Sequence, residues 1–120
     1  MKIKVELDAG YVFDMLAILK VKNEMNGDMK SILNLLEFEE GVYTQISIER
    51  FNKILNSGEF QDLYYKNLEI FCAVDKAKLD EIKASQVDRL NYDRWVLKNK
   101  LQEKFFGEKT TEQKIGYGES

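Results

Sequence analysis

Residues 60–106 set most of the fold, and they read FQDLYYKNLEIFCAVDKAKLDEIKASQVDRLNYDRWVLKNKLQEKFF. Two runs of apolar residues recur there every three or four positions, the spacing that gives a helix one buried face. The first run is Phe60, Leu63, Tyr64, Phe71 and Val74, and the second is Val87, Leu90, Leu97, Leu101 and Phe105. A short link at residues 83–85 separates them, which predicts a long antiparallel helical hairpin.

The N-terminal half predicts shorter elements. Apolar residues at helical spacing predict about three helices between residues 9 and 55. Before them, Ile3, Val5 and Leu7 alternate with charged residues, which is the two-residue period of a half-buried strand. A strand needs a partner, and we expect it either in residues 42–46 or in a second copy of the chain. An extended arm packed on helices is the alternative.

Together these elements predict a mainly helical α+β domain over residues 1–106. An N-terminal strand or small sheet would pack with a bundle of about four to five helices that ends in the hairpin. Residues 107–120 show no apolar period, and we expect a polar, mobile tail there. The chain of 120 residues has the length of one domain, and 44% hydrophobic with 32% charged residues is typical of a globular protein.

The composition excludes several kinds of chemistry. The sequence contains no histidine, and Cys72 is its only cysteine, which we expect to be buried and inert. Catalysis by Ser-His or Cys-His pairs, histidine or thiolate metal sites and an intrachain disulfide are thereby excluded. No glycine-rich phosphate loop is present either. We therefore expect a non-enzymatic protein without metal or cofactor.

The ends and the hydropathy of the chain predict its location. The first residues, MKIKVELDAG, hold no apolar run of signal-peptide length, and no stretch approaches the length of a membrane span. We expect no membrane association and a location in the cytoplasm, where a single free thiol is ordinary.

Polar residues interrupt the apolar faces of the hairpin. Asn67 lies on the first face and Asp75 follows it, whereas Asn91 and Arg94 lie on or beside the second. In a hairpin that turns near residue 84, residues equidistant from the turn meet, so Asp75 is expected beside Arg94. Burying an arginine without a carboxylate partner would be very costly.

Three interpretations of these residues stay open. They form a buried ion pair of Asp75 with Arg94 that fixes the helix register, or a polar protein interface, or a pocket for a small anionic ligand. In the pocket, Arg94 would anchor the anion. The complete candidate site is Arg94, Asn91, Asn67, Asp75, Tyr92 and Trp95, with either aromatic ring stacking on a base.

The last predicted helix also carries a basic strip. Its cations are Arg94, Lys98, Lys100 and Lys104, and Tyr92 and Trp95 lie among them. Cations interleaved with aromatic rings can bind single-stranded nucleic acid. The chain as a whole is acidic, with 18 basic and 21 acidic residues and a net charge of -3, so nucleic acid is an unexpected partner. A solvated helix face is the alternative.

The aromatic content points to a further buried surface. Tyr65 and Trp95 fall off the main apolar stripes of the hairpin, and two helices cannot bury all the aromatic residues on one face each. Such an excess predicts a homo-oligomer or a protein partner. Coverage of the rings by the N-terminal helices is the alternative.

The segment from residue 67 to 106 resembles small proteins of unknown function carried by tailed phages. The matching stretches follow the patterns NLxxFxxVDxA, KAxxVDxLNxxR and LQxxFF. The resemblance implies an accessory or anti-defence protein that works by binding. The first hypothesis is sequestration of a small anionic ligand such as a signalling nucleotide. The alternatives are an inhibitor or assembly factor that binds a host protein through an aromatic helix face, and a nucleic-acid binder.

Overall fold

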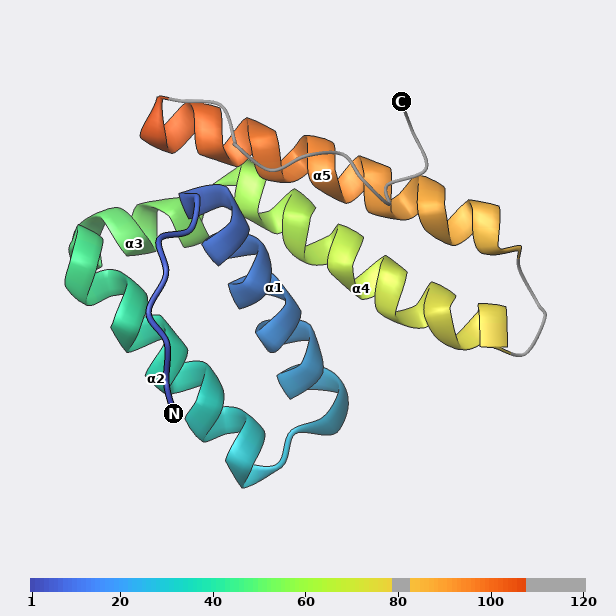
Figure 1. Ribbon diagram of the computed structural model, residues 1–120, viewed down its shortest axis with the longest axis horizontal. Coiled ribbons are helices and arrows are strands. Elements are labelled where there is room, and N and C mark those ends of the chain that lie inside the picture. The colour runs from blue at the N-terminus through green and yellow to red at the C-terminus, as the bar shows by residue number, and fades with distance from the viewer. Residues whose placement is uncertain (79–82, 108–120) are drawn as a thin grey trace.

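A computed structural model describes residues 1–78 and 83–107, with side chains for all of these except residues 76–78, and the described part contains five helices (Figure 1). They are α1 (Ala9–Asn26), α2 (Met29–Ile46), α3 (Ile48–Leu55), α4 (Gly58–Lys78) and α5 (Ala84–Phe106). Helices α4 and α5 lie side by side and run in opposite directions, and α1 packs against α2, α4 and α5 (Figure 1). Helix α1 therefore joins the two halves of the molecule.

The predicted N-terminal strand or small sheet is wrong. Residues 1–8 run as a stretched-out segment beside α2, and no strand occurs in the described ranges 1–78 and 83–107 (Figure 1). The candidate partner, residues 42–46, forms the last turns of α2, where Val42 is 9% exposed and belongs to the core. An alternating pattern is local, whereas a strand needs a neighbour for its backbone hydrogen bonds. The fold class is all-α for the described residues and not α+β.

A single residue, Ser47, connects α2 to α3. Its φ of 98° and ψ of 149° form a backbone conformation that is rare for a residue with a side chain and costs about 1–3 kcal/mol. The cost is offset by two caps, because the Ser47 N–H donates to the Tyr43 carbonyl at 2.8 Å and its Oγ accepts from the Arg50 N–H at 3.2 Å. The chain therefore turns sharply without a loop.

The core is centred on Phe13 of α1, which is 1% exposed. Its ring centroid lies 6.1 Å from that of Phe51, 6.3 Å from that of Phe60 and 6.2 Å from that of Phe106. Tilted and edge-on ring pairs at this separation are favourable. The remaining buried members are Leu16, Ala17, Leu35, Val42, Ile54, Leu63 and Leu101. All five helices therefore contribute to one core.

Helix α1 begins in direct contact with α5 at Gly10. A Cβ atom at this position would lie 2.8 Å from the backbone oxygen of Lys98, so only glycine permits the approach. The Gly10 N–H also donates to Oε1 of Gln102 at 2.5 Å. The crossing of α1 and α5 is therefore fixed by backbone packing and by one buried hydrogen bond.

None of the helices, over the part of the chain that the structure describes, combines the length and the apolar character needed to cross a bilayer. The expected tail of residues 107–120 lies outside the described residues except for Gly107, which ends α5 with a φ of 69°. A left-handed glycine is a common way to end a helix.

Candidate functional site

A polar cluster lies where α1, α4 and α5 meet, and it consists of Asp14, Asn67 and Arg94. Nδ2 of Asn67 donates to Oδ1 of Asp14 at 2.9 Å, and Oδ1 of Asn67 accepts from Nη1 of Arg94 at 3.5 Å. Nε of Arg94 lies 3.6 Å from Oδ2 of Asp14. Each helix supplies one member, so the Asp14–Asn67–Arg94 cluster links three helices.

The cluster is largely withdrawn from water. Asp14 is 3% exposed and Asn67 is 4% exposed, while the Arg94 side chain keeps 20% of its surface exposed. A second hydrogen bond from Nδ2 of Asn67 to the Leu63 carbonyl, at 3.0 Å, orients the amide. A buried carboxylate is tolerated only when it is paired and hydrogen-bonded, and both conditions hold for Asp14.

The expected pairing of Asp75 with Arg94 is not what the structure shows. The carboxylate beside Arg94 is Asp14 of α1, and Asp75 is exposed on α4. The physical reason is the position of the hairpin turn. Contact between Asn67 and Arg94 places the midpoint of the helix pair near residue 80, because α4 continues to Lys78. A midpoint near residue 84 would have been needed to bring Asp75 to Arg94.

Asn91 does not join the cluster. Its Nδ2 donates to the Val87 carbonyl at 3.2 Å, one turn back on the same helix. This bond is local and leaves the side chain part-buried on α5. Of the candidate polar residues, the structure therefore brings together Asn67 and Arg94, and leaves Asn91 and Asp75 apart from them.

Tyr92 and Trp95 lie against each other on α5. Their ring centroids are 5.9 Å apart with an interplanar angle of 24°, and the Arg89 guanidinium lies 5.6 Å from the Tyr92 centroid. Both residues are partly buried. The sequence predicted that one of these rings would stack on a base of a ligand, whereas in the structure the two rings stack on each other.

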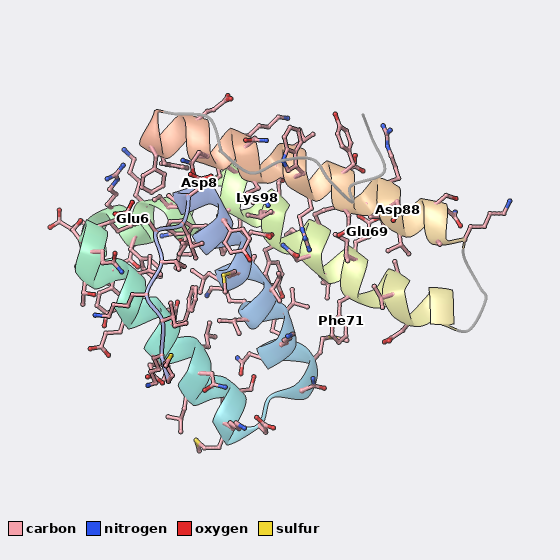
Figure 2. All side chains as sticks on the ribbon, in the orientation of Figure 1. Glu6, Asp8, Glu69, Phe71, Asp88 and Lys98 are labelled. Carbon is pink, nitrogen blue, oxygen red and sulfur yellow. The ribbon has the colours of Figure 1, made fainter. Side chains whose placement is uncertain are left out.

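The predicted basic strip is interrupted in the structure. Lys98 is 0% exposed, and its Nζ lies 5.4 Å from the centroid of the Tyr11 ring (Figure 2 labels Lys98 where α5 passes the start of α1). Arg94 faces Asp14, and Nζ of Lys104 lies 2.8 Å from Oε1 of Glu59. The same contact with Lys104 lowers the pKa of Glu59. Three of the four cations therefore have an intramolecular role, and the face is not a row of free charges.

The prediction for Cys72 can be compared with the structure. Cys72 is exposed on α4, contrary to the expected burial, because it points away from the face that carries Phe60 and Leu63. No group of three or more potential metal-ligating side chains occurs among the residues that the structure describes.

Sequence reasoning missed Asp14. The residue stands inside the apolar run Val12-Phe13-Asp14-Met15-Leu16, and a charged residue at such a position is the signal that could have identified it. The spacing of apolar residues within α1 does not show which face of the helix contacts α5, so Arg94 could not be named as the partner of Asp14.

Helix α2 leaves an apolar surface in solvent. Its members, which we call the α2 stripe, are Met29 (69% exposed), Ile32 (37%), Leu33 (56%) and Leu36 (55%). Only Leu35 and Val42 of this helix are buried. The stripe extends along the N-terminal half of α2, while α3 follows directly from the other end of the helix.

A second polar contact lies near the C-terminal end of α1. The Tyr64 hydroxyl donates to Oε2 of Glu24, at the edge of a groove of about 330 Å³ between α1, α3 and α4. Burial, and after it this hydrogen bond, raises the pKa of Tyr64 to about 12. The contact stabilises the neutral phenol.

Comparison with known proteins adds no relative. The sequence matches no protein-family model, and no curated protein and no solved structure gives a significant match. The function is therefore argued from the residues and their geometry.

Proposed function

We propose that this protein is a non-enzymatic binding protein whose target is another protein, and that the α2 stripe is its docking surface. The observation that carries the proposal is the exposure of four large apolar side chains, between 37% and 69%, on one side of one helix. Single exposed apolar residues are ordinary, whereas contiguous ones mark interaction sites.

The spacing within the α2 stripe favours a helix as the bound segment. Met29, Ile32, Leu33 and Leu36 follow the i, i+3, i+4, i+7 pattern, by which amphipathic helices pack on each other. Glu37 and Glu40 are exposed one turn beyond Leu33 and Leu36 and put negative charge at that end of the stripe. We therefore expect the target to present an amphipathic helix with Lys or Arg at the end that meets these carboxylates.

The Asp14–Asn67–Arg94 cluster favours this function over the capture of a small anion. An anion bound at Arg94 would lie near the Asp14 carboxylate, which is 3.6 Å from Nε, and would be repelled by it. The cluster is better suited to holding three helices together. Tyr92 and Trp95 already stack on one another, which leaves less ring surface for a base.

The resemblance to small tailed-phage proteins implies an accessory or anti-defence factor that works by binding, and we propose a protein of the host as its target. The absence of histidine from the whole sequence removes the usual acid–base group at neutral pH, in keeping with binding as the activity.

Site-specific photo-crosslinking tests the proposal. A photo-reactive amino acid replaces Leu33 in one variant and the exposed Lys53 of α3 in another, and both are irradiated in the cells that make the protein. We expect a discrete adduct from position 33 and none from position 53. With the photo-reactive amino acid at position 29, we expect an adduct when Leu33 and Leu36 are present and no adduct in the variant Leu33→Ser/Leu36→Ser. Equal adducts from positions 33 and 53, or an adduct that survives the double substitution, would contradict the proposal.

A further inference from the structure

A groove of about 660 Å³ lies between the N-terminal segment and helices α1 and α2. The segment of residues 1–7, which we call the arm, runs beside α2 and forms one wall of the groove with Val5 and Leu7 (Figure 1). The apolar side chains on the helical side are Val12, Met15, Phe38 and Val42. A groove of this volume, lined mainly by apolar side chains, is typical of a binding site for a small molecule.

The apolar lining continues from the groove to the core. A neighbouring cavity of about 140 Å³ shares Leu7, Val12 and Val42 with the groove. It is also lined by Phe13 and Phe106, whose rings pack together in the core. The apolar space therefore extends from the exposed arm to the centre of the molecule, which suits an elongated apolar chain.

The charged side chains of the groove are both acidic. Glu6 of the arm, which Figure 2 labels, and Glu37 of α2 belong to the lining, and no lysine or arginine of the described residues does. Both carboxylates are exposed, and neither has a hydrogen-bond or ion-pair partner within the described part of the chain. The groove therefore offers negative charge beside an apolar wall, which attracts a cation and repels an anion.

We propose that this groove binds a small amphiphile that carries one positive charge on an apolar chain, and that an alkylamine represents this class. The chain lies between the arm and the α1–α2 wall, and the ammonium group lies beside Glu6 and Glu37. The arm keeps the position that it has in the structure. Binding covers Val5 and Leu7, which are otherwise 70% and 49% exposed.

The bound chain would also join the arm to the helices. Within the described part of the protein, no hydrogen bond or ion pair links residues 1–7 to the helices. An apolar chain in contact with both walls adds the contacts that the arm lacks. The groove contains Phe38 and Val42, on another side of α2 from the α2 stripe, so this proposal does not rest on the proposed function.

Methyl NMR of the full chain, labelled at methionine, tests where and what the groove binds. Met15 lines the groove, whereas Met25 and Met29 do not, and Met29 belongs to the α2 stripe. The probes are decylamine and decanoate, which share one chain and differ in charge, at low salt and below the concentrations at which they form micelles. We expect decylamine to shift the Met15 signal saturably and to leave that of Met29 in place. Decanoate should bind about tenfold more weakly.

Two pairs of variants separate the apolar wall from the charge. Val5→Ser should weaken decylamine binding by about fivefold or more. Ile3→Ser, the matched change at an exposed arm residue outside the lining, should not alter it. Glu6→Gln should weaken decylamine and strengthen decanoate, each by about two- to fivefold, whereas a merely structural effect would weaken both. Asp62→Asn, which removes one exposed carboxylate of α4, is the charge control and should change neither.

Four results would overturn the proposal. The first is the absence of a saturable Met15 shift up to about 1 mM decylamine. The second is equal affinity for decylamine and decanoate, and the third is equal loss of binding in Val5→Ser and Ile3→Ser. The fourth is a Met15 signal that moves with protein concentration and not with decylamine, since a second copy of the chain would then cover the groove.

Discussion

Asp14 on the first helix and Arg94 on the last form a buried ion pair, with Oδ2 of Asp14 3.6 Å from Nε of Arg94. Asn67 of α4 donates to the first residue and accepts from the second. Together with Asn67, the pair therefore joins α1, α4 and α5, the three helices that carry most of the tertiary contacts of the protein.

Replacing Arg94 by alanine should destabilise the fold strongly. Removing one partner of a buried ion pair leaves the other charge without compensation, which costs about 3–5 kcal/mol. Asp75→Ala, at an exposed position, should change the free energy of unfolding by less than about 0.5 kcal/mol. Urea unfolding followed by circular dichroism measures both. A folded, equally stable Arg94→Ala protein would show that the ion pair is not structural and would revive a ligand-binding role for this arginine.

Two glycine substitutions should have opposite effects. Gly10→Ala places a Cβ atom 2.8 Å from the Lys98 backbone oxygen, so α1 and α5 must separate, at a cost of about 1–3 kcal/mol. Gly41→Ala places its Cβ where no atom lies within 4 Å, inside α2, and should stabilise the helix by about 0.5–1 kcal/mol. Thermal unfolding of the two variants separates the effects. A Gly10→Ala protein as stable as the wild type or more stable would show that the α1–α5 approach is not tight.

The Tyr64 hydroxyl should lose its proton at a higher pH than an ordinary tyrosine, and the free energy of unfolding should fall at high pH as a result. Its pKa is raised to about 12 in the folded protein, mainly by burial and then by the hydrogen bond to Glu24. In the unfolded chain, tyrosine titrates near pH 10, so the folded state binds more protons between these two values. The resulting stability is complete below about pH 10 and is lost as the pH rises through the folded pKa.

Tyrosinate absorbance measures this titration. The difference between the wild type and Tyr64→Phe should contain one group that titrates above the ordinary range, and Glu24→Gln should lower its pKa. A difference spectrum with a midpoint near pH 10 would mean that Tyr64 is solvated and does not contact Glu24.

Cys72 should react in the folded protein. Its exposure on α4 predicts stoichiometric modification by a thiol reagent without denaturant, at a rate close to that of the unfolded chain. Cys72→Ser should change stability by less than about 0.5 kcal/mol. Protection of the thiol until the chain unfolds would indicate that another surface covers this side of α4.

Local patterns predicted the helical segments of the C-terminal half, but not their register. The short link at residues 83–85 placed the turn near residue 84. In the structure α5 starts at Ala84, and the Gln86 side chain accepts from the Lys83 N–H at 2.8 Å. Because α4 extends to Lys78, the midpoint of the helix pair lies near residue 80. Arg94 therefore lies at the level of Asn67 on α4 and not at the level of Asp75.

The need for a carboxylate near Arg94 could be predicted, whereas its identity could not. The free-energy cost of burying the Arg94 charge can be judged from Arg94 and its own helix, and that cost correctly predicted a carboxylate partner. Asp14 reaches Arg94 only because α1 crosses α4 and α5, and that crossing depends on Gly10 and Phe13. The N-terminal strand failed for a related reason, since alternation in Ile3, Val5 and Leu7 carries no information about a neighbour.

The position of α1 has a consequence for synthesis on the ribosome. Phe13 packs on Phe106 as well as on Phe51 and Phe60, and the Gly10 N–H is satisfied by Gln102, so α1 completes its contacts only when α5 has been made. Until α5 leaves the exit tunnel, the part of α1 around Gly10 that α5 covers stays open to chaperones and to other nascent chains. Folding of these five helices should therefore be completed only after α5 has emerged, and the emergence of α1–α3 should not by itself commit them to the native state.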